Sequence, residues 1–233
     1  MFTIALAQMN IGIDNKYVYT ENMCRDYITE ESAEFIVSVS DEEIEKEKTS
    51  ADIDSGYAES LAIYRKIATK ILSQNGFLMH GVVADIKGEG VAFLAPSGTG
   101  KSTHAALWQK LLREEFTYVN GDKPLIRILN NRVYAYGTPW AGKENLHSNM
   151  KTELKKLCFI RRAEENSCVK LKKTEVLELL MKQIYLPYNA GSFLSFLNLL
   201  SIFIENIEFY LINCNTNIDA AKTACEVIFN DKC

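Results

Sequence analysis

A short apolar run leads directly into a loop of small residues, and this order constrains the fold more than any other feature of the chain. Residues 90–94 read Gly-Val-Ala-Phe-Leu, which is typical of a buried strand. Residues 95–102 follow as Ala-Pro-Ser-Gly-Thr-Gly-Lys-Ser, and apolar residues then recur at helical spacing as far as Leu112. A strand, a glycine loop and a helix in direct succession predict an α/β fold.

The loop has the spacing of a phosphate-binding (Walker A) P-loop. In such a loop the backbone N–H groups converge on phosphate oxygens, and glycines leave the room that a side chain would fill. Lys101 is placed to reach the β- and γ-phosphates and the Ser102 hydroxyl to bind Mg²⁺, with Thr103 as a second hydroxyl. The usual first glycine is Ala95 here, and the fixed φ of Pro96 is compatible with that change. The residues predicted to bind the nucleotide are Pro96, Ser97, Gly98, Thr99, Gly100, Lys101, Ser102 and Thr103.

An acidic residue follows the next strand-like run. Residues 116–119 are Phe-Thr-Tyr-Val, and Asn120-Gly121-Asp122 comes directly after them. A carboxylate at the end of a strand can bind Mg²⁺, directly or through water, or accept a proton from a substrate hydroxyl. The alternative is an aspartate in an ordinary turn, because Asn-Gly-Asp is turn-prone. We therefore predict Asp122 as the acid that completes the metal site, together with Ser102.

Periodicity predicts the remaining elements. We expect residues 1–54 to form a small β-rich N-terminal lobe in which 41–47 is a solvated connector, and residues 55–233 to form the main core. Lys87-Gly88-Glu89-Gly90 has the glycines of a tight hairpin. The other predicted helices are 57–72, 175–184, 192–204 and 218–229, and the other predicted strands are 77–84, 125–129, 133–136, 157–160 and 209–212.

Composition excludes several classes of protein. With 30 acidic and 26 basic residues the net charge is −4, which disfavours a nucleic-acid partner. The six cysteines form no C-x-x-C pair, so they predict neither a zinc site nor a disulfide framework. The apolar start of the chain lacks a basic lead, and the later apolar stretch 193–204 is too short to span a bilayer. We expect a cytoplasmic protein without a membrane partner.

Several motifs together resemble a known family. They are His80-Gly81, Gly90-Val91, the loop through Ser102, Val119-Asn120-Gly121-Asp122 and Tyr136-Gly137-Thr138-Pro139-Trp140. This set is similar to the catalytic core of HPr kinase/phosphorylase and, more closely, to the short bacterial proteins labelled phosphoenolpyruvate-carboxykinase-like. The likeness covers roughly residues 77–162 and differs from the bacterial HPr kinases in having Gly121-Asp122 where they have paired aspartates. The stretch 137–143 also differs from their glycine-rich signature loop.

The resemblance implies a P-loop kinase core of the HPr kinase / PEP carboxykinase type, with a mixed, bent sheet. It also implies that His80 lies beside Asp122 near the transferred phosphate, and that the protein self-associates. From the residues alone, a histidine between apolar neighbours is more often a core residue than a catalyst. The loop 137–145 combines a proline, an aromatic, glycines and a cation, which suits a mobile cover. Trp140 and Lys143 are its candidate substrate contacts, although packing and solvation would explain both equally well.

These expectations combine into an ATP- and Mg²⁺-dependent kinase that transfers the γ-phosphoryl group to a hydroxyl. Lys101, Asp122 and His80 are its predicted catalytic residues. The acceptor is either a serine of a peptide or protein, or a small alcohol. The alternative is a regulatory module that binds ATP as a conformational switch, with little or no phosphoryl transfer.

Overall fold

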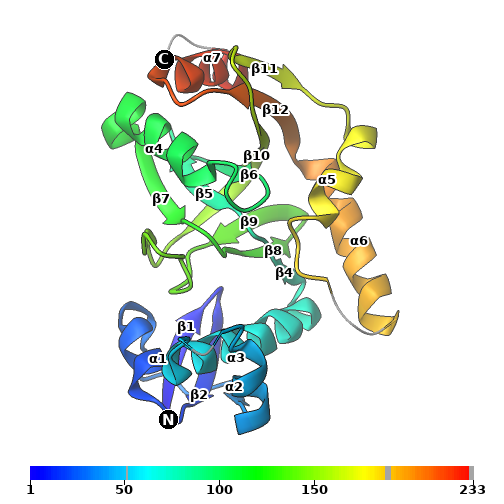
Figure 1. The fold of residues 1–233 in the computed structure, drawn as a ribbon. Coiled ribbons are helices and arrows are strands. Elements are labelled where there is room, and N and C mark those ends of the chain that lie inside the picture. The colour runs from blue at the N-terminus through cyan, green and yellow to red at the C-terminus, as the bar shows by residue number, and fades with distance from the viewer. Residues whose placement is uncertain (51, 187–189, 231–233) are drawn as a thin grey trace. The chain divides into compact units, whose positions relative to one another are not determined.

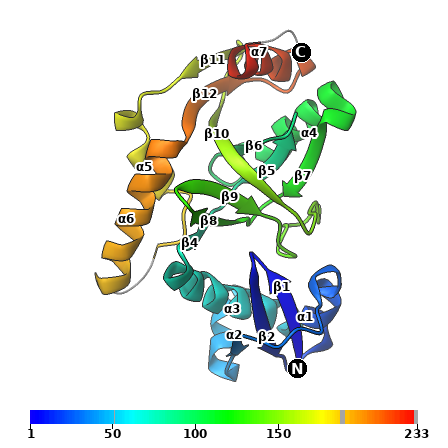
Figure 2. The same ribbon diagram turned by 180° about the vertical axis from the view of Figure 1, so that it is seen from behind.

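The computed structural model describes residues 1–50, 52–186 and 190–230 (Figure 1; Figure 2 gives the reverse view). The chain divides into two compact units, Met1–Gln74 and Asn75–Cys233. It is a mixed α/β protein in which the first unit holds a small sheet and the second a curled mixed sheet. No helix in the described ranges is both long enough and apolar enough to cross a bilayer.

In the described part of the first unit, three strands pair in the order β1-β2-β3. The first two form an antiparallel hairpin whose turn residues, Ala7 and Gln8, both have positive φ, and β3 is parallel to β2. The elements are β1 Phe2–Leu6, β2 Met9–Asp14, α1 Val18–Met23, η1 Arg25–Tyr27, β3 Phe35–Ser38, α2 Asp41–Glu47, α3 Ser55–Lys70 and η2 Ile71–Gln74. The lobe is therefore a three-stranded sheet that carries several helices.

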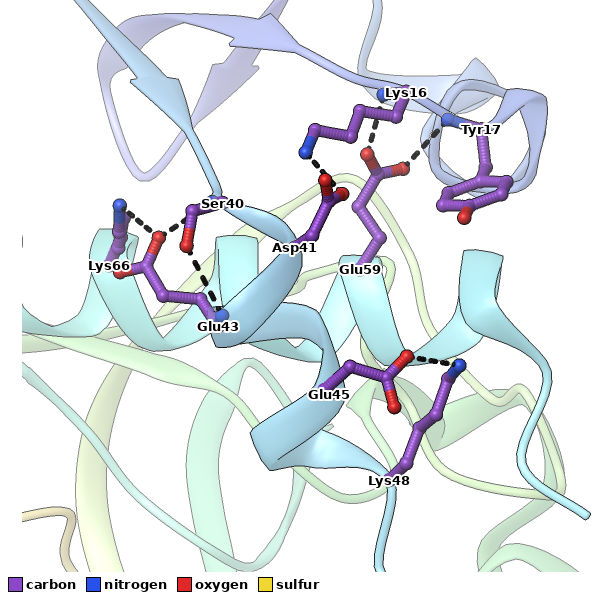
Figure 3. A network of polar contacts seen from close by, with 9 residues as sticks. All are labelled: Lys16, Tyr17, Ser40, Asp41, Glu43, Glu45, Lys48, Glu59 and Lys66. Carbon is purple, nitrogen blue, oxygen red and sulfur yellow. Dashed lines mark hydrogen bonds and ion pairs between the residues drawn. The ribbon is translucent and has the colours of Figure 1, made fainter. Parts of the chain in front are cut away.

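Two features of this unit differ from the expectations. The unit ends after Gln74 rather than after residue 54, because α3 packs against α1, α2 and β3 and so belongs with the small sheet. Residues 41–47 are the helix α2 rather than a connector, since Ser40 and Glu43 form a reciprocal capping box that satisfies two free N–H groups at its start (Figure 3).

A buried carboxylate connects α3 to the start of α1. Glu59 on α3 is fully buried, and its two carboxylate oxygens accept hydrogen bonds from the backbone N–H groups of Lys16 (2.5 Å) and Tyr17 (3.1 Å) (Figure 3). The hydroxyl of Thr20 lies 3.3 Å from the same carboxylate. A negative charge beside a helix N-terminus is stabilised both by these donors and by the helix dipole. Glu59 is thus a structural residue of the first unit.

Replacing Glu59 by Gln should test this assignment. The amide puts an N–H₂ group where the carboxylate accepts, so at least one backbone donor loses its partner, and the first unit should lose about 1–3 kcal/mol of stability. The measurement is urea unfolding combined with hydrogen exchange at the Lys16 and Tyr17 amides. Glu45→Gln, which removes an exposed carboxylate paired with Lys48, is the control and should cost under about 0.5 kcal/mol. Equal losses in the two variants would contradict the assignment.

The second unit is built on one large sheet. Among the described residues nine strands join it, and its main path runs β4-β8-β9-β10-β6-β5-β7, with β12 on β10 and β11 on β12. The strands are β4 Gly76–Leu78, β5 Val82–Ile86, β6 Glu89–Leu94, β7 Phe116–Asn120, β8 Leu125–Leu129, β9 Arg132–Tyr136, β10 Lys151–Arg162, β11 Ser167–Lys170 and β12 Glu208–Cys214. The helices are α4 Lys101–Leu112, η3 Arg113–Glu115, η4 Lys173–Glu175, α5 Leu177–Met181, α6 Ala190–Asn206 and α7 Ile218–Phe229.

The long strand β10 joins the two halves of this sheet. Its first residues, 151–153, pair antiparallel with β9, whereas residues 154–162 run parallel to β6 and β12 (Figure 1). The sheet is therefore mixed, and it curls where β10 passes from one set of partners to the other. The sequence pattern predicts a strand only at residues 157–160, because charged residues occupy four of the first six positions of β10, around the buried Thr152 and Leu154.

Helices cover the sheet where apolar side chains face outward. α4 and α7 pack against each other over β5, β6 and β12, and α6 contacts β8 and β9 (Figure 2). The ring of Phe77 on β4 meets Phe196 and Phe203 of α6 edge to face at 5.9 and 5.4 Å between centroids. The helix predicted at 218–229 and the strands at 125–129 and 209–212 match α7, β8 and β12, whereas residues 177–181 form only the short helix α5.

His104, one turn into α4, is a core residue. It is 2 % exposed, its ring packs edge to face on Phe93, and its Nε2 accepts a hydrogen bond from the Trp108 indole N–H at 2.9 Å. Burial lowers the pKa of His104 to about 4, because the charged imidazolium would lose its hydration. The folded protein therefore holds this side chain neutral.

His104 should make stability depend on pH. Its folded pKa lies below the unfolded value near 6.5, so the unfolded chain binds more protons between pH 6.5 and 4, and stability falls as pH falls through that window. The loss by pH 4.5 should be roughly 2 kcal/mol. His104→Gln, which keeps an acceptor for Trp108, should remove that part of the slope in urea titrations from pH 7.5 to 4.5. Parallel curves for the two proteins would overturn the prediction.

Candidate nucleotide and phosphoryl-transfer site

Four segments meet at one edge of the large sheet. β6 and β10 are parallel, and β5 runs antiparallel to both β6 and β7, so the carboxyl ends of β6, β7 and β10 share an edge with the start of β5. The glycine loop follows β6, Asp122 follows β7, and His80 precedes β5. The sheet topology thus brings together segments that are more than 40 residues apart in the chain.

The glycine loop has a defined backbone. Thr99 N–H donates to the Pro96 carbonyl at 3.2 Å, which closes a turn with Gly98 at φ +77°, and Gly100 has φ +113° at the start of α4. Those φ values favour glycine. No atom lies within 4 Å of the position that a Cβ would take on Gly98 or Gly100. Open space therefore borders both glycines.

The start of α4 presents free donors beside that space. His104 N–H bonds to the Gly100 carbonyl and closes the first helical turn. Within the described chain, the N–H groups of the four preceding residues (Gly100, Lys101, Ser102 and Thr103) form no hydrogen bond. Aligned donors at the positive end of a helix dipole are an anion-binding arrangement. Ser102 is partly exposed and Thr103 exposed, so both hydroxyls are accessible.

Lys101 is the most buried residue of this loop segment after Ala95. Its side chain folds back so that Nζ donates to the Ala95 carbonyl at 2.9 Å and lies 3.3 Å from Nε2 of His80. Burial lowers the pKa of the Lys101 ammonium, the nearby Lys123 lowers it further, and the charge of Asp122 acts in the opposite direction. An ammonium held in this way is poised next to the free donors of α4.

The histidine lies in a break between two strands. Residues 77–84 are not one continuous strand, because β4 ends at Leu78 and β5 begins at Val82. In the gap, His80 N–H donates to the Gln183 carbonyl (2.7 Å) and Gly81 N–H to the Asp122 carbonyl (2.9 Å). The imidazole is half-buried, and its Nε2 lies 3.3 Å from both Lys101 Nζ and Asp122 Oδ1. One ring nitrogen therefore links the three predicted catalytic side chains.

Asn120 holds Asp122 in place. This side chain is fully buried, and its Oδ1 accepts from the N–H groups of Asp122 (2.9 Å) and Lys123 (2.6 Å). Its Nδ2 donates to the carbonyl and the hydroxyl of Thr138, at 2.9 and 3.0 Å. The turn-prone Asn-Gly-Asp sequence does form a turn, and the same turn delivers the carboxylate to the site.

The carboxylate of Asp122 is strongly acidic. Burial alone would raise its pKa, but hydrogen bonds from His80 to Oδ1 and from Lys123 to Oδ2 outweigh burial and lower the pKa to about 2. Asp122 is therefore ionised at neutral pH. A serine hydroxyl and a carboxylate are oxygen ligands of the kind that Mg²⁺ prefers, so Ser102 and Asp122 fit a cation that also binds phosphate oxygens. No cluster of three or more His, Cys, Asp or Glu side chains suited to a metal occurs in the described ranges.

The loop 137–145 lies against the carboxylate. Gly142 has φ +76°, and a Cβ there would be 3.0 Å from Cβ of Asp122. At the base of the loop, a Cβ on Gly137 would be 1.9 Å from the Ser148 carbonyl oxygen, so only glycine fits. Trp140 is 4 % exposed and Lys143 is exposed. The tryptophan is thus buried, and the lysine is the accessible one of the two predicted substrate contacts.

Three residues of this region escaped the sequence-based prediction. Asn120 and Lys123 flank Asp122 and fix its position and charge, and Arg162 at the end of β10 donates to the Thr99 and Gly98 carbonyls. The Asn-Gly-Asp turn motif pointed to Asn120. Nothing near Arg162 in the sequence indicates its contact with a loop more than 60 residues away.

Replacing Asn120 by Ala should loosen both Asp122 and the loop. Two backbone N–H groups and the Thr138 carbonyl lose their buried partner, which should cost about 2–4 kcal/mol in urea unfolding. Limited proteolysis should also cut the segment 137–150 faster. Asn198→Ala, at an exposed position on α6, is the control and should leave both measurements unchanged. An unchanged cleavage rate in Asn120→Ala would show that the asparagine does not hold the loop.

Comparisons with known proteins give only a partial likeness. No protein-family model matches the sequence, and no curated protein matches it. The structure is similar to the HPr(Ser) kinase/phosphatase from Coxiella burnetii with a TM-score of 0.30 and 14% sequence identity, over 55% of this chain and 89% of that chain. This likeness is weak, so the function rests on the residues of this chain.

Proposed function

We propose that this protein is an ATP- and Mg²⁺-dependent kinase that transfers the γ-phosphoryl group to a hydroxyl acceptor. The observation that carries the proposal is the set of free N–H groups at residues 100–103 beside a buried ammonium and an ionised carboxylate, both in contact with His80. Phosphoryl transfer uses hydrogen-bond donors and a cation to bind the phosphate oxygens and a carboxylate to bind Mg²⁺, and residues of these kinds lie together at one edge of the sheet.

In this proposal the loop binds the polyphosphate and Lys101 compensates its charge. The free amides of α4 receive phosphate oxygens, and Lys101 Nζ exchanges its contact with the Ala95 carbonyl for the β- and γ-phosphates. Mg²⁺, held by Ser102 and Asp122, would neutralise charge on the same phosphate oxygens. Most of the rate enhancement would come from orientation and from these fixed charges.

His80 and Asp122 act as a pair on the acceptor. The low pKa of Asp122 makes it a weak proton acceptor at neutral pH, which favours roles in metal binding and in orienting the imidazole. Nε2 of His80 donates to that carboxylate at 3.3 Å, which leaves Nδ1 as the ring nitrogen suited to receive the proton of the acceptor hydroxyl. The acceptor is a serine of a peptide or protein, or a small alcohol, and it would enter beside Lys143.

One observation favours a second function, an ATP-binding regulatory module without appreciable transfer. Lys123 already pairs with Oδ2 of Asp122, and the residue before Asp122 is Gly121 rather than a second acid. A carboxylate bound by two side chains is less available to a metal ion. This module would bind ATP but would form no acceptor-dependent product.

Two substitutions distinguish nucleotide binding from phosphoryl transfer. Lys101→Ala should weaken MgATP binding in calorimetry by about 100-fold, because it removes the cation facing the β- and γ-phosphates.

Asp122→Asn should keep metal-free ATP affinity within about threefold but lower acceptor-dependent transfer from γ-labelled ATP by at least about 100-fold. The acceptor panel is a set of serine peptides, hydroxy amino acids and sugars.

Lys110→Ala, which removes an exposed lysine from the same helix, is the matched control and should behave like the wild type. ATP binding with no labelled product from any acceptor would favour the regulatory module. Absence of MgATP affinity in the folded wild-type protein would overturn both functions.

A further inference from the structure

The last residue of β10 reaches the glycine loop because of strand pairing. β10 is parallel to β6, with Phe159 opposite Leu94, so both strands end at the same edge of the sheet. On its other side β10 pairs with β12, where Arg162 lies opposite Cys214. The backbone of Arg162 is therefore fixed by a central strand, while its side chain lies beside the loop that follows Leu94.

The guanidinium of Arg162 binds two successive carbonyl groups of that loop. Nε donates to the Thr99 carbonyl at 2.9 Å, and a terminal nitrogen donates to the Gly98 carbonyl. These parallel bonds use the planar fork of arginine, which a lysine ammonium cannot reproduce. In a trans peptide the C=O and the following N–H point in opposite directions. A carbonyl of Thr99 turned toward Arg162 therefore turns the N–H of Gly100 away from it.

The loop needs such an anchor. Gly98 and Gly100 have no side chains to pack, and glycine has more conformational freedom to lose than any other residue. Besides the Pro96–Thr99 turn, the first turn of α4 and the bond from Lys101 Nζ to the Ala95 carbonyl, the bonds from Arg162 hold this backbone in the described structure, and they are the ones made to Gly98 and Thr99. The guanidinium is exposed and forms no ion pair with an acidic side chain among the described residues, so the two loop carbonyls are the protein groups that it binds.

We propose that Arg162 is a positioning residue that holds the glycine loop ready for a polyphosphate, with the N–H of Gly100 facing the ligand side. This inference rests on the proposed function for the identity of the ligand, but the fixing of the loop is a property of the nucleotide-free protein. Arg162 acts through the backbone of residues 98–100 and needs no contact with the phosphates.

The test compares Arg162→Gln and Arg162→Lys with Arg161→Gln. Arg161 is the preceding residue on β10, is exposed, and makes no side-chain hydrogen bond in the described structure, so its variant removes the same charge without touching the loop. Hydrogen exchange in the nucleotide-free proteins follows the amides of Thr99 and His104, which are bonded within the loop and the first helical turn. Calorimetry with MgADP measures the affinity for a polyphosphate.

Arg162→Gln should exchange both amides about tenfold faster and bind MgADP about tenfold more weakly, as expected for losing two charge-assisted hydrogen bonds at an exposed site. Arg162→Lys should lie between it and the wild type, and Arg161→Gln should match the wild type. Equal exchange rates and equal MgADP affinities in Arg162→Gln and Arg161→Gln would overturn the inference. The effect would then come from the loss of one positive charge and not from the bonds to the loop. If the wild type bound no MgADP, the proposed function would fail, whereas the exchange rates would still decide whether Arg162 holds the loop.

Discussion

The parallel pairing of β10 with β6 is the constraint on which the second unit depends. Through it one long strand belongs to both halves of the sheet, and three strand ends come to the same edge. Those ends carry a loop rich in free N–H groups, a carboxylate and a guanidinium. Each of these groups is common in proteins when taken alone. They can act together here because the sheet topology places the three strand ends at one edge.

The polar interactions at this edge form a hierarchy. Asn120 is fully buried and ties the turn of Asp122 to Thr138, which makes it the rigid part of the arrangement. His80, Lys123 and Lys101 are arranged around the carboxylate by side-chain contacts that can change when a ligand binds. A rigid buried frame with adjustable charged groups at its surface is the usual design of a site in which geometry matters more than stability.

The sequence allowed part of this structure to be predicted. Gly98, Gly100 and the helix after them follow from local rules of backbone freedom and periodicity, so the loop and α4 could be located within a residue or two. The break at His80 could not, because residues 77–84 have continuous strand character and only the distant Gln183 and Asp122 carbonyls interrupt them. The contact of Arg162 with the loop and the burial of Glu59 also depend on packing between segments that are far apart in the sequence. Local sequence patterns do not predict such contacts.

The close approach at Gly137 has a consequence for how such a protein could diversify. Two stretches of main chain meet there with no room for a methyl group, so close backbone packing at Gly137 closes the loop together with the Asn120–Thr138 hydrogen bonds. Sequence changes between the two ends, around Lys143, would leave that closure untouched. The exposed residues around Lys143 can therefore change in evolution while the turn of Asp122 beneath them keeps its geometry, provided that position 137 remains glycine.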